Sequence, residues 1–157
     1  MTPEQLAVVR ESYHSLGSDA TSMAADFYRR LFAADPSTRA LFSDGPEVMA
    51  VKFTAELDAI VEAIASFDEF RSRVADLGAR HAAYGVQATH YRAVGEALVA
   101  SLAAHLGKRW DDSLEAAWRR AYNLVAETMM TAQQAVSRRS RVASTRTAHR
   151  PDEAASP

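Results

Sequence analysis

The sequence predicts an all-α chain, because its apolar residues recur at helical spacing and its helix boundaries carry capping residues, prolines and glycines. Between Met49 and Ile64, apolar residues return every three or four positions, which places them on one helical face. No useful length of chain alternates between apolar and polar residues, as a half-buried strand would. We therefore expect a bundle of helices without a sheet.

The helix boundaries follow from local chemistry. Thr2, Pro3 and Gln5 form a capping box with a first-turn proline, so the first helix begins at Pro3. Glycine or proline ends most later segments, since neither continues a helix well. The expected helices are approximately 3–16, 19–34, 46–65, 68–84, 89–106 and 111–136, with a short helical turn over 36–42.

Length and composition fit one domain with a core large enough for a ligand. The chain has 157 residues, 48% of them hydrophobic, and a formal net charge of −2, so no global field favours nucleic acid or anionic membrane. The absence of cysteine excludes disulfides and thiolate metal ligands. The N-terminus has acidic residues where a signal peptide is basic, and no run of about 18 apolar residues occurs. We expect a cytoplasmic protein without a membrane span.

Composition changes after Val136. Residues 137–157 are rich in Ser, Thr, Arg and Ala and carry too little apolar area to pack, so we expect residues 1–136 to form the domain and 137–157 a disordered basic tail. The tail is interpreted either as a solvated extension or as a contact for phosphates or an acidic partner. Its arginines are Arg138, Arg139, Arg141, Arg146 and Arg150.

The most informative stretch is LGARHAAYGVQATHY, from Leu77 to Tyr91, with His81 near the end of a predicted helix. A lone histidine in a helix is more often a surface or core residue than a ligand. However, LGARHAAYGV followed by HYRAVGEAL resembles the globins, specifically bacterial single-domain haemoglobins and the haem domain of flavohaemoglobins. The resemblance covers about residues 3–136. It implies the globin fold, with six to eight helices around one haem b, and His81 as the axial iron ligand.

Two motifs near the N-terminus carry the same resemblance. DFYRRLF, from Asp26 to Phe32, is similar to the distal wall of these globins, which implies that Tyr28 points at the bound ligand. ALF, from Ala40 to Phe42, implies that Phe42 lies against the haem plane. Judged singly, each aromatic residue is equally well explained by core packing.

On the proximal side, the resemblance implies a tyrosine and a glutamate around the histidine, which increase the electron density on iron. Tyr91, ten positions after His81, matches the tyrosine, whereas Gln133 stands where the glutamate aligns. A neutral amide carries no charge, so we expect a weaker electronic effect. This departure argues against peroxidase-like and fast dioxygenase behaviour more than against dioxygen binding.

The distal helix departs as well. Counting back from His81 with the spacing of these globins places Met49 at the distal position, with Phe53 one turn later as an apolar lid. A one-residue gap would instead place Ala50 there. Because a thioether is no useful hydrogen-bond donor, Tyr28 becomes the main donor to bound dioxygen. Met49 is interpreted either as packing or as a sixth iron ligand.

The remaining expected haem contacts are of two kinds. Arg80 and Lys52 are candidates for the haem propionates, and the alternative for both is a solvated surface charge. Tyr84 belongs to the YGV motif and is interpreted as packing. The expected apolar contacts are Leu77, Val86, Val94, Leu98 and Met129.

Three classes of function remain open. The first is a haem protein that reversibly binds dioxygen and related diatomic ligands, for oxygen transport or storage, with possible nitric oxide detoxification. The second is a nitric oxide dioxygenase served by a separate reductase, or a haem-based redox or gas sensor; no GxGxxG motif or Rossmann-like alternation is present in the chain. The third is a haem-free helical interaction domain. Ligand affinity, iron coordination without ligand and oligomeric state stay open.

Overall fold

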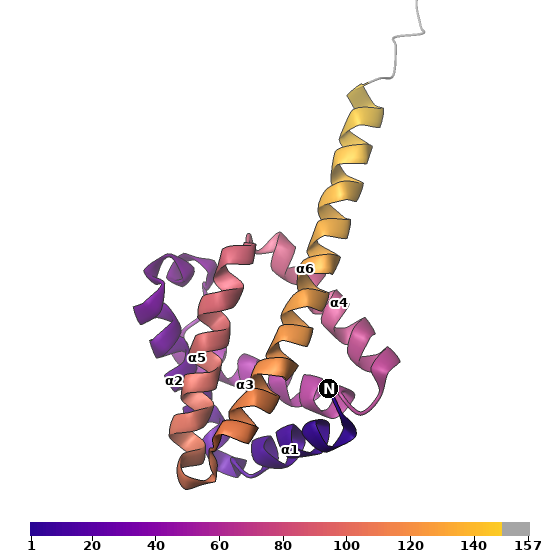
Figure 1. Cartoon of the computed structure of the whole chain (residues 1–157). Helices are drawn as coiled ribbons and strands as arrows, with labels where there is room; N and C mark the ends of the chain where they lie inside the picture. The colour runs from indigo at the N-terminus through magenta and orange to yellow at the C-terminus, as the bar shows by residue number, and fades with distance from the viewer. Residues whose placement is uncertain (149–157) are drawn as a thin grey trace, which may run out of the picture.

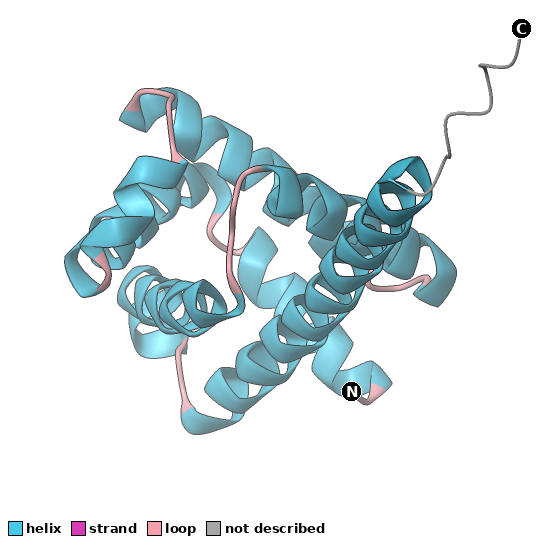
Figure 2. Ribbon diagram, turned by 90° about the horizontal axis from the view of Figure 1, so that it is seen from above, coloured by secondary structure: helices cyan, strands magenta, loops and turns pink. Residues whose placement is uncertain are grey.

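The computed structural model describes residues 1–148, and residues 149–157 lie outside the described part. Within that part every regular element is a helix, which confirms the predicted fold class (Figures 1 and 2). The α-helices are α1 (Pro3–His14), α2 (Ala20–Ala34), α3 (Pro46–Ala63), α4 (Phe67–Ala83), α5 (Ala88–Leu106) and α6 (Asp112–Ala148). Short 3-10 segments, η1 (Gly17–Asp19), η2 (Pro36–Leu41) and η3 (Gly107–Arg109), connect some of them.

The first helix begins as predicted. Thr2 Oγ1 accepts the Gln5 N–H at 3.3 Å, and Gln5 Oε1 accepts the Thr2 N–H at 3.1 Å, which completes the capping box. Tyr13 is buried in the core, and Trp118 Nε1 donates to Ser12 Oγ at 3.0 Å. These contacts fix α1 to α6.

The turn after α2 positions Phe42. Asp35 ends α2, and its carboxylate accepts the Ser37 N–H at 3.1 Å, so it caps η2. Pro36 takes the first position of that segment, where a missing N–H costs nothing. Phe42 follows in extended backbone, with its ring centroid 5.6 Å from that of Phe32 on α2. The predicted helical turn is confirmed over residues 36–41, whereas Phe42 itself is extended.

Two glycines allow helices to approach closely. A Cβ on Gly78 of α4 would lie 2.6 Å from the backbone oxygen of Met129 on α6, so only glycine permits this crossing. A Cβ on Gly95 of α5 would lie 2.5 Å from the ring of Tyr122 on α6. Helix α6 therefore packs against both α4 and α5. The stretch from Leu77 to Tyr91 runs from the end of α4 to the start of α5.

The last helix is longer than predicted. We expected it to end near Val136, but α6 continues to Ala148 and leaves the body of the molecule as a single projecting helix (Figure 1). The helix end therefore differs from the expected one, and the division into a domain of residues 1–136 and a disordered tail of residues 137–157 stays a prediction. Adding residues to an existing helix avoids the cost of nucleation, and Ala and Arg favour helix. The rest of the predicted tail, 149–157, lies outside the described residues.

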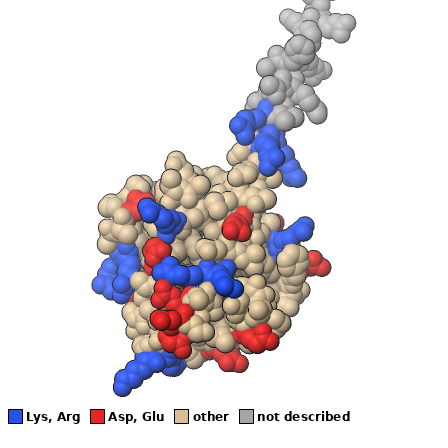
Figure 3. Space-filling model, viewed as in Figure 1, with Lys and Arg blue, Asp and Glu red and all other residues tan. Residues whose placement is uncertain are grey.

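Acidic and basic side chains are mixed over most of the face in Figure 3, and basic side chains gather where α6 leaves the body. Arg138, Arg139 and Arg141 are exposed in that segment. Among the residues that could be described, no helix is both long and apolar enough to cross a membrane.

Candidate functional site

The side chain of His81 is held in a defined tautomer. His81 lies in the last turn of α4, and its Nδ1 is 2.9 Å from the carbonyl oxygen of Leu77 one turn earlier. Because a carbonyl oxygen can only accept, Nδ1 carries the proton. Nε2 then presents its lone pair, and no described residue forms a hydrogen bond with it. This is the arrangement that a histidine ligand of a metal requires.

Burial favours the neutral form of this ring. Desolvation is the largest effect and lowers the pKa of His81 below its ordinary value of 6.5, and the nearby Arg80 guanidinium lowers it further. The hydrogen bond to Leu77 and the charge of Glu56 act in the opposite direction but are smaller in sum. At neutral pH the imidazole is therefore uncharged and available as a ligand.

The loop after His81 is tied to two elements. The Val86 N–H donates to the carbonyl of His81 at 3.1 Å, and Gly85 takes a φ of 80°, which a residue with a side chain rarely adopts. From α6, Gln133 Nε2 donates to the carbonyl of Val86 at 3.3 Å. Gln133 thus contacts the loop that follows the histidine, and its amide forms no hydrogen bond with Tyr91.

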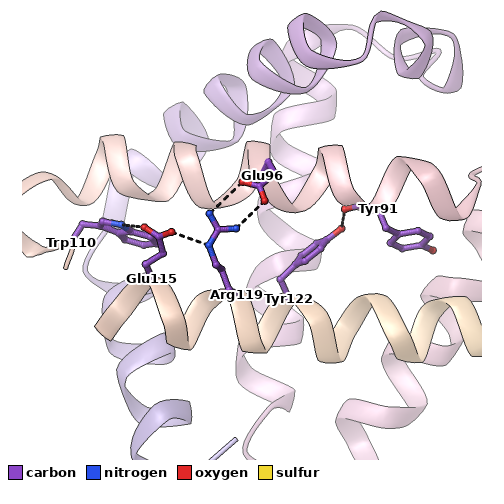
Figure 4. Close-up of polar contacts among 6 residues, drawn as sticks. All are labelled: Tyr91, Glu96, Trp110, Glu115, Arg119 and Tyr122. Atoms are coloured by element: carbon purple, nitrogen blue, oxygen red, sulfur yellow. Dashed lines mark hydrogen bonds and ion pairs between the residues drawn. The ribbon is translucent and has the colours of Figure 1, made fainter. Parts of the chain in front are cut away.

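Tyr91 contributes an unsatisfied group. Its side chain is 7% exposed, and its hydroxyl oxygen has no hydrogen-bond partner among the described residues. Burial raises the pKa of Tyr91 to about 12, so the hydroxyl stays protonated at neutral pH. Its backbone is fixed from α6, because the Tyr122 hydroxyl donates to the Tyr91 carbonyl (Figure 4). Burying a hydroxyl without a hydrogen-bond partner destabilises the folded protein, so such a group calls for an explanation.

The distal candidates form an aromatic cluster around Tyr28. The ring centroid of Tyr28 lies 5.2 Å from that of Phe42 and 5.7 Å from that of Phe53, and both pairs are edge-to-face. Phe53 also stacks on Phe27 at 4.4 Å. The structure therefore brings Tyr28, Phe42 and Phe53 together from α2, the segment after η2, and α3.

The Tyr28 hydroxyl is a neutral donor without a hydrogen-bond partner among the described residues. Burial is the main cause that raises the pKa of Tyr28 to about 12, and the charge of Asp44 adds to it. Met49 is 4% exposed and lies on α3 one turn before Phe53, next to the buried Ala50. At the expected distal position, α3 therefore carries the thioether of Met49 or the methyl group of Ala50, and neither group is charged.

The two basic candidates are paired with carboxylates. Lys52 Nζ lies 2.7 Å from Asp44 Oδ2, and an Arg80 guanidinium nitrogen lies 3.2 Å from Glu56 Oε2. Arg73 also approaches Glu56, at 3.6 Å. These contacts are exposed or half-exposed and contribute little to stability, so the basic groups can exchange partners readily.

The apolar candidates divide by burial. Leu77, Val86 and Val94 are partly buried and pack against the core, whereas Leu98 and Met129 lie within it. Sequence reasoning missed Glu56 and Asp44, the carboxylates that pair with Arg80 and Lys52. Glu56 follows Phe53 by three positions on the inward stripe of α3, so this spacing was the available signal.

The chain belongs to the globin family. The family model described as Globin matches residues 25–129, which is most of the described domain. Among curated proteins, neuroglobin of Danio rerio is 28% identical over 82% of this chain and 90% of its own length. Flavohemoprotein of Bordetella pertussis is 27% identical over 87% of this chain, which spans only 35% of that protein.

A solved structure agrees with this membership. The engineered carbene transferase RmaNOD, described as a putative nitric oxide dioxygenase from Rhodothermus marinus, has 30% identity and a TM-score of 0.77. The likeness covers 87% of this chain and 95% of that one.

The residues present fit the haem that a globin implies. The test is the donor set: His81 offers a neutral Nε2 with Nδ1 already hydrogen-bonded, and an aromatic cluster supplies apolar walls. No group of three His, Cys, Asp or Glu side chains that could hold a metal ion by itself occurs in the described part of the chain. A single histidine is sufficient for haem, because the porphyrin nitrogens complete the equatorial coordination.

Proposed function

We propose that this globin is a haem protein that reversibly binds dioxygen and related diatomic ligands, with His81 as the axial ligand. The observation that carries the proposal is the hydrogen bond from His81 Nδ1 to the Leu77 carbonyl, which leaves Nε2 free. When bound, haem supplies an iron atom that accepts diatomic ligands and exchanges an electron. The protein's part is to orient the imidazole, exclude water and provide one hydrogen-bond donor.

Tyr28 is the proposed distal donor. The Tyr28 side chain is partly buried, and its ring packs against those of Phe42 and Phe53. Because burial raises its pKa to about 12, the hydroxyl is protonated at neutral pH. A buried hydrogen bond to a partly negative ligand contributes about 1.5–3 kcal/mol. Met49 adds no useful donor, so Tyr28 alone sets the polar character of this side.

Lys52 and Arg80 are proposed to contact the haem propionates. Each is at present paired with a carboxylate, Asp44 or Glu56, at 2.7 Å and 3.2 Å. A propionate presents the same charge and acceptor geometry as these side chains. The pairs therefore keep the basic groups near the site and are exchanged for propionates when haem binds.

A second candidate is nitric oxide dioxygenase activity, favoured by the likeness to RmaNOD at 30% identity. In this reaction nitric oxide and dioxygen would combine to nitrate, and one electron would have to be supplied to the haem for each turnover. A separate electron donor is proposed to supply it. Gln133, bound to Val86, leaves the proximal side without the carboxylate that would favour fast oxygen chemistry.

The experiment measures both functions on the haem-loaded protein. Optical titration with dioxygen should give reversible, saturable binding, and failure to bind dioxygen reversibly would overturn the carrier proposal. Nitric oxide is then added to the oxygenated protein with and without a reductase. Nitrate produced in a single turnover without re-reduction indicates a carrier, whereas sustained turnover with the reductase indicates an enzyme.

A further inference from the structure

A groove separate from the His81–Tyr28 region runs between the end of α4 and the part of α6 that leaves the body. Its volume is about 490 Å³, within the range of small-molecule sites. Ala82, Val86 and Met130 supply apolar surface, and Gln133, Arg138 and Arg141 supply the polar side. Of these lining residues, Val86 is also an expected haem contact, whereas Met130, Arg138 and Arg141 are not.

One face of α6 builds the polar side. Positions 130, 134, 137, 138 and 141 recur at helical spacing, so their side chains lie along one stripe of the helix. Arg138 and Arg141, three positions apart, are neighbours on that stripe. Met130 marks its apolar end, nearer the body. The groove therefore changes from apolar to basic along its length.

The described residues that line this groove give it a basic end. None of these described residues is acidic, and Arg138 Nε donates to the uncharged carbonyl of Gln134 at 3.4 Å. A second groove, between α5 and α6, differs in this respect. There Arg119 lies 3.0 Å from Glu96 and 2.8 Å from Glu115, so its charge is neutralised (Figure 4).

We propose that the groove at the end of α4 binds a free fatty-acid anion. The acyl chain lies on Ala82, Val86 and Met130, where burial of each methylene contributes about 0.8 kcal/mol. The carboxylate lies at the other end, where guanidinium groups form charge-assisted and bidentate hydrogen bonds with carboxylates. Neither a neutral lipid nor an inorganic anion satisfies both ends of the groove.

Binding here reaches the segment that carries His81. Ala82 follows His81 directly, and the Val86 carbonyl accepts the Gln133 amide that borders the same groove. A bound chain therefore contacts the loop that holds the histidine. An effect of the fatty acid on haem binding depends on the proposed function, because it requires that His81 binds haem. Binding of the fatty acid in the groove does not depend on it.

The test uses isothermal titration calorimetry of the haem-loaded full chain with laurate below its micelle concentration. We expect saturable binding of one laurate, and binding about tenfold weaker to the double variant R138Q/R141Q, as loss of charged hydrogen bonds requires. Dodecanol, with the same chain and no charge, should also bind about tenfold more weakly. The matched control is Arg139→Gln, which removes an adjacent arginine that does not line the groove and should leave affinity unchanged.

Three outcomes would overturn the proposal. The first is equal affinity in the double variant and the parent. The second is laurate binding to the haem-free chain but not to the haem-loaded chain, which would place laurate in the haem site. The third is retention on phosphatidylglycerol vesicles without binding of free laurate, which would assign the arginines to a membrane surface. If the chain takes up no haem yet binds laurate through Arg138 and Arg141, only the haem proposal fails.

Discussion

The amide of Gln133 on α6 donates to the carbonyl of Val86 at 3.3 Å and so joins residues 47 positions apart in the sequence. Val86 in turn donates its N–H to the His81 carbonyl at 3.1 Å. The orientation of the histidine thus depends on a side chain of the last helix as well as on its own helix. The Tyr91 hydroxyl, by contrast, is buried and has no hydrogen-bond partner among the described residues.

Gln133→Glu should loosen the loop after His81. A carboxylate has no N–H to donate, so the bond to the Val86 carbonyl is lost and its oxygen faces a second acceptor. The opening free energy of the loop should fall by about 1–2 kcal/mol, which is about tenfold in amide hydrogen exchange over residues 84–87. Gln134→Glu, at an exposed neighbour, is the control. Equal exchange in both variants would remove Gln133 from this role.

Tyr28→Phe should raise the dioxygen dissociation rate severalfold, because the distal donor is lost while the ring packing is kept. The pKa of Tyr28 near 12 predicts that the rate of the parent stays constant from about pH 7 to pH 10. Stopped-flow release of dioxygen measures both. Tyr13→Phe is the control, since the Tyr13 hydroxyl donates to the Thr54 carbonyl instead. If the two variants release dioxygen alike, Tyr28 does not face the ligand.

The haem-free chain should lose stability on acidification through His81. Burial lowers the folded-state pKa below 6.5, so between that lowered pKa and 6.5 the unfolded chain binds more protons. The contribution of His81 is therefore complete above pH 6.5 and is lost as the pH falls through the folded pKa. Urea unfolding at several pH values measures it. His81→Leu should show a shallower dependence, and an identical slope would contradict the shift.

Gly78→Ala should destabilise the domain by about 1–3 kcal/mol, because the new Cβ would overlap the backbone of Met129 and push α4 away from α6. Gly45→Ala is the matched control, since no atom lies within 4 Å of the added Cβ and φ is −68°. Urea unfolding compares the two variants. Similar stabilities would show that the crossing adjusts at little cost.

Local chemistry made much of the fold predictable. Capping by Thr2, the stop at Asp35-Pro36 and the inward stripe of α3 depend on residues close in sequence, and the structure contains each of them. Helix α6 continues past the end expected near Val136, because composition indicates the ability to pack a core, whereas a helix already begun extends without one.

The site was predictable only in part for a related reason. His81, Tyr28 and Phe42 stand in recognisable local motifs, but the partner of Gln133 depends on how α6 crosses the loop at residues 84–87. That crossing depends on the close approach of α4 and α6 at Gly78 and Met129, which are 51 positions apart in the sequence. Likewise, the pairing of Glu56 with Arg80 requires α3 and α4 to be placed side by side. No local pattern contains such information.

The most direct test of the central claim is the optical and resonance Raman spectrum of the ferrous protein after haem is added to the purified chain. We expect one haem per chain, a Soret band and an iron–histidine stretching mode in the ligand-free state. His81→Gly should lose that mode and regain an iron–imidazole mode when imidazole is supplied. A parent chain that takes up no haem, or a His81→Gly variant whose spectrum equals that of the parent, would contradict His81 as the axial ligand.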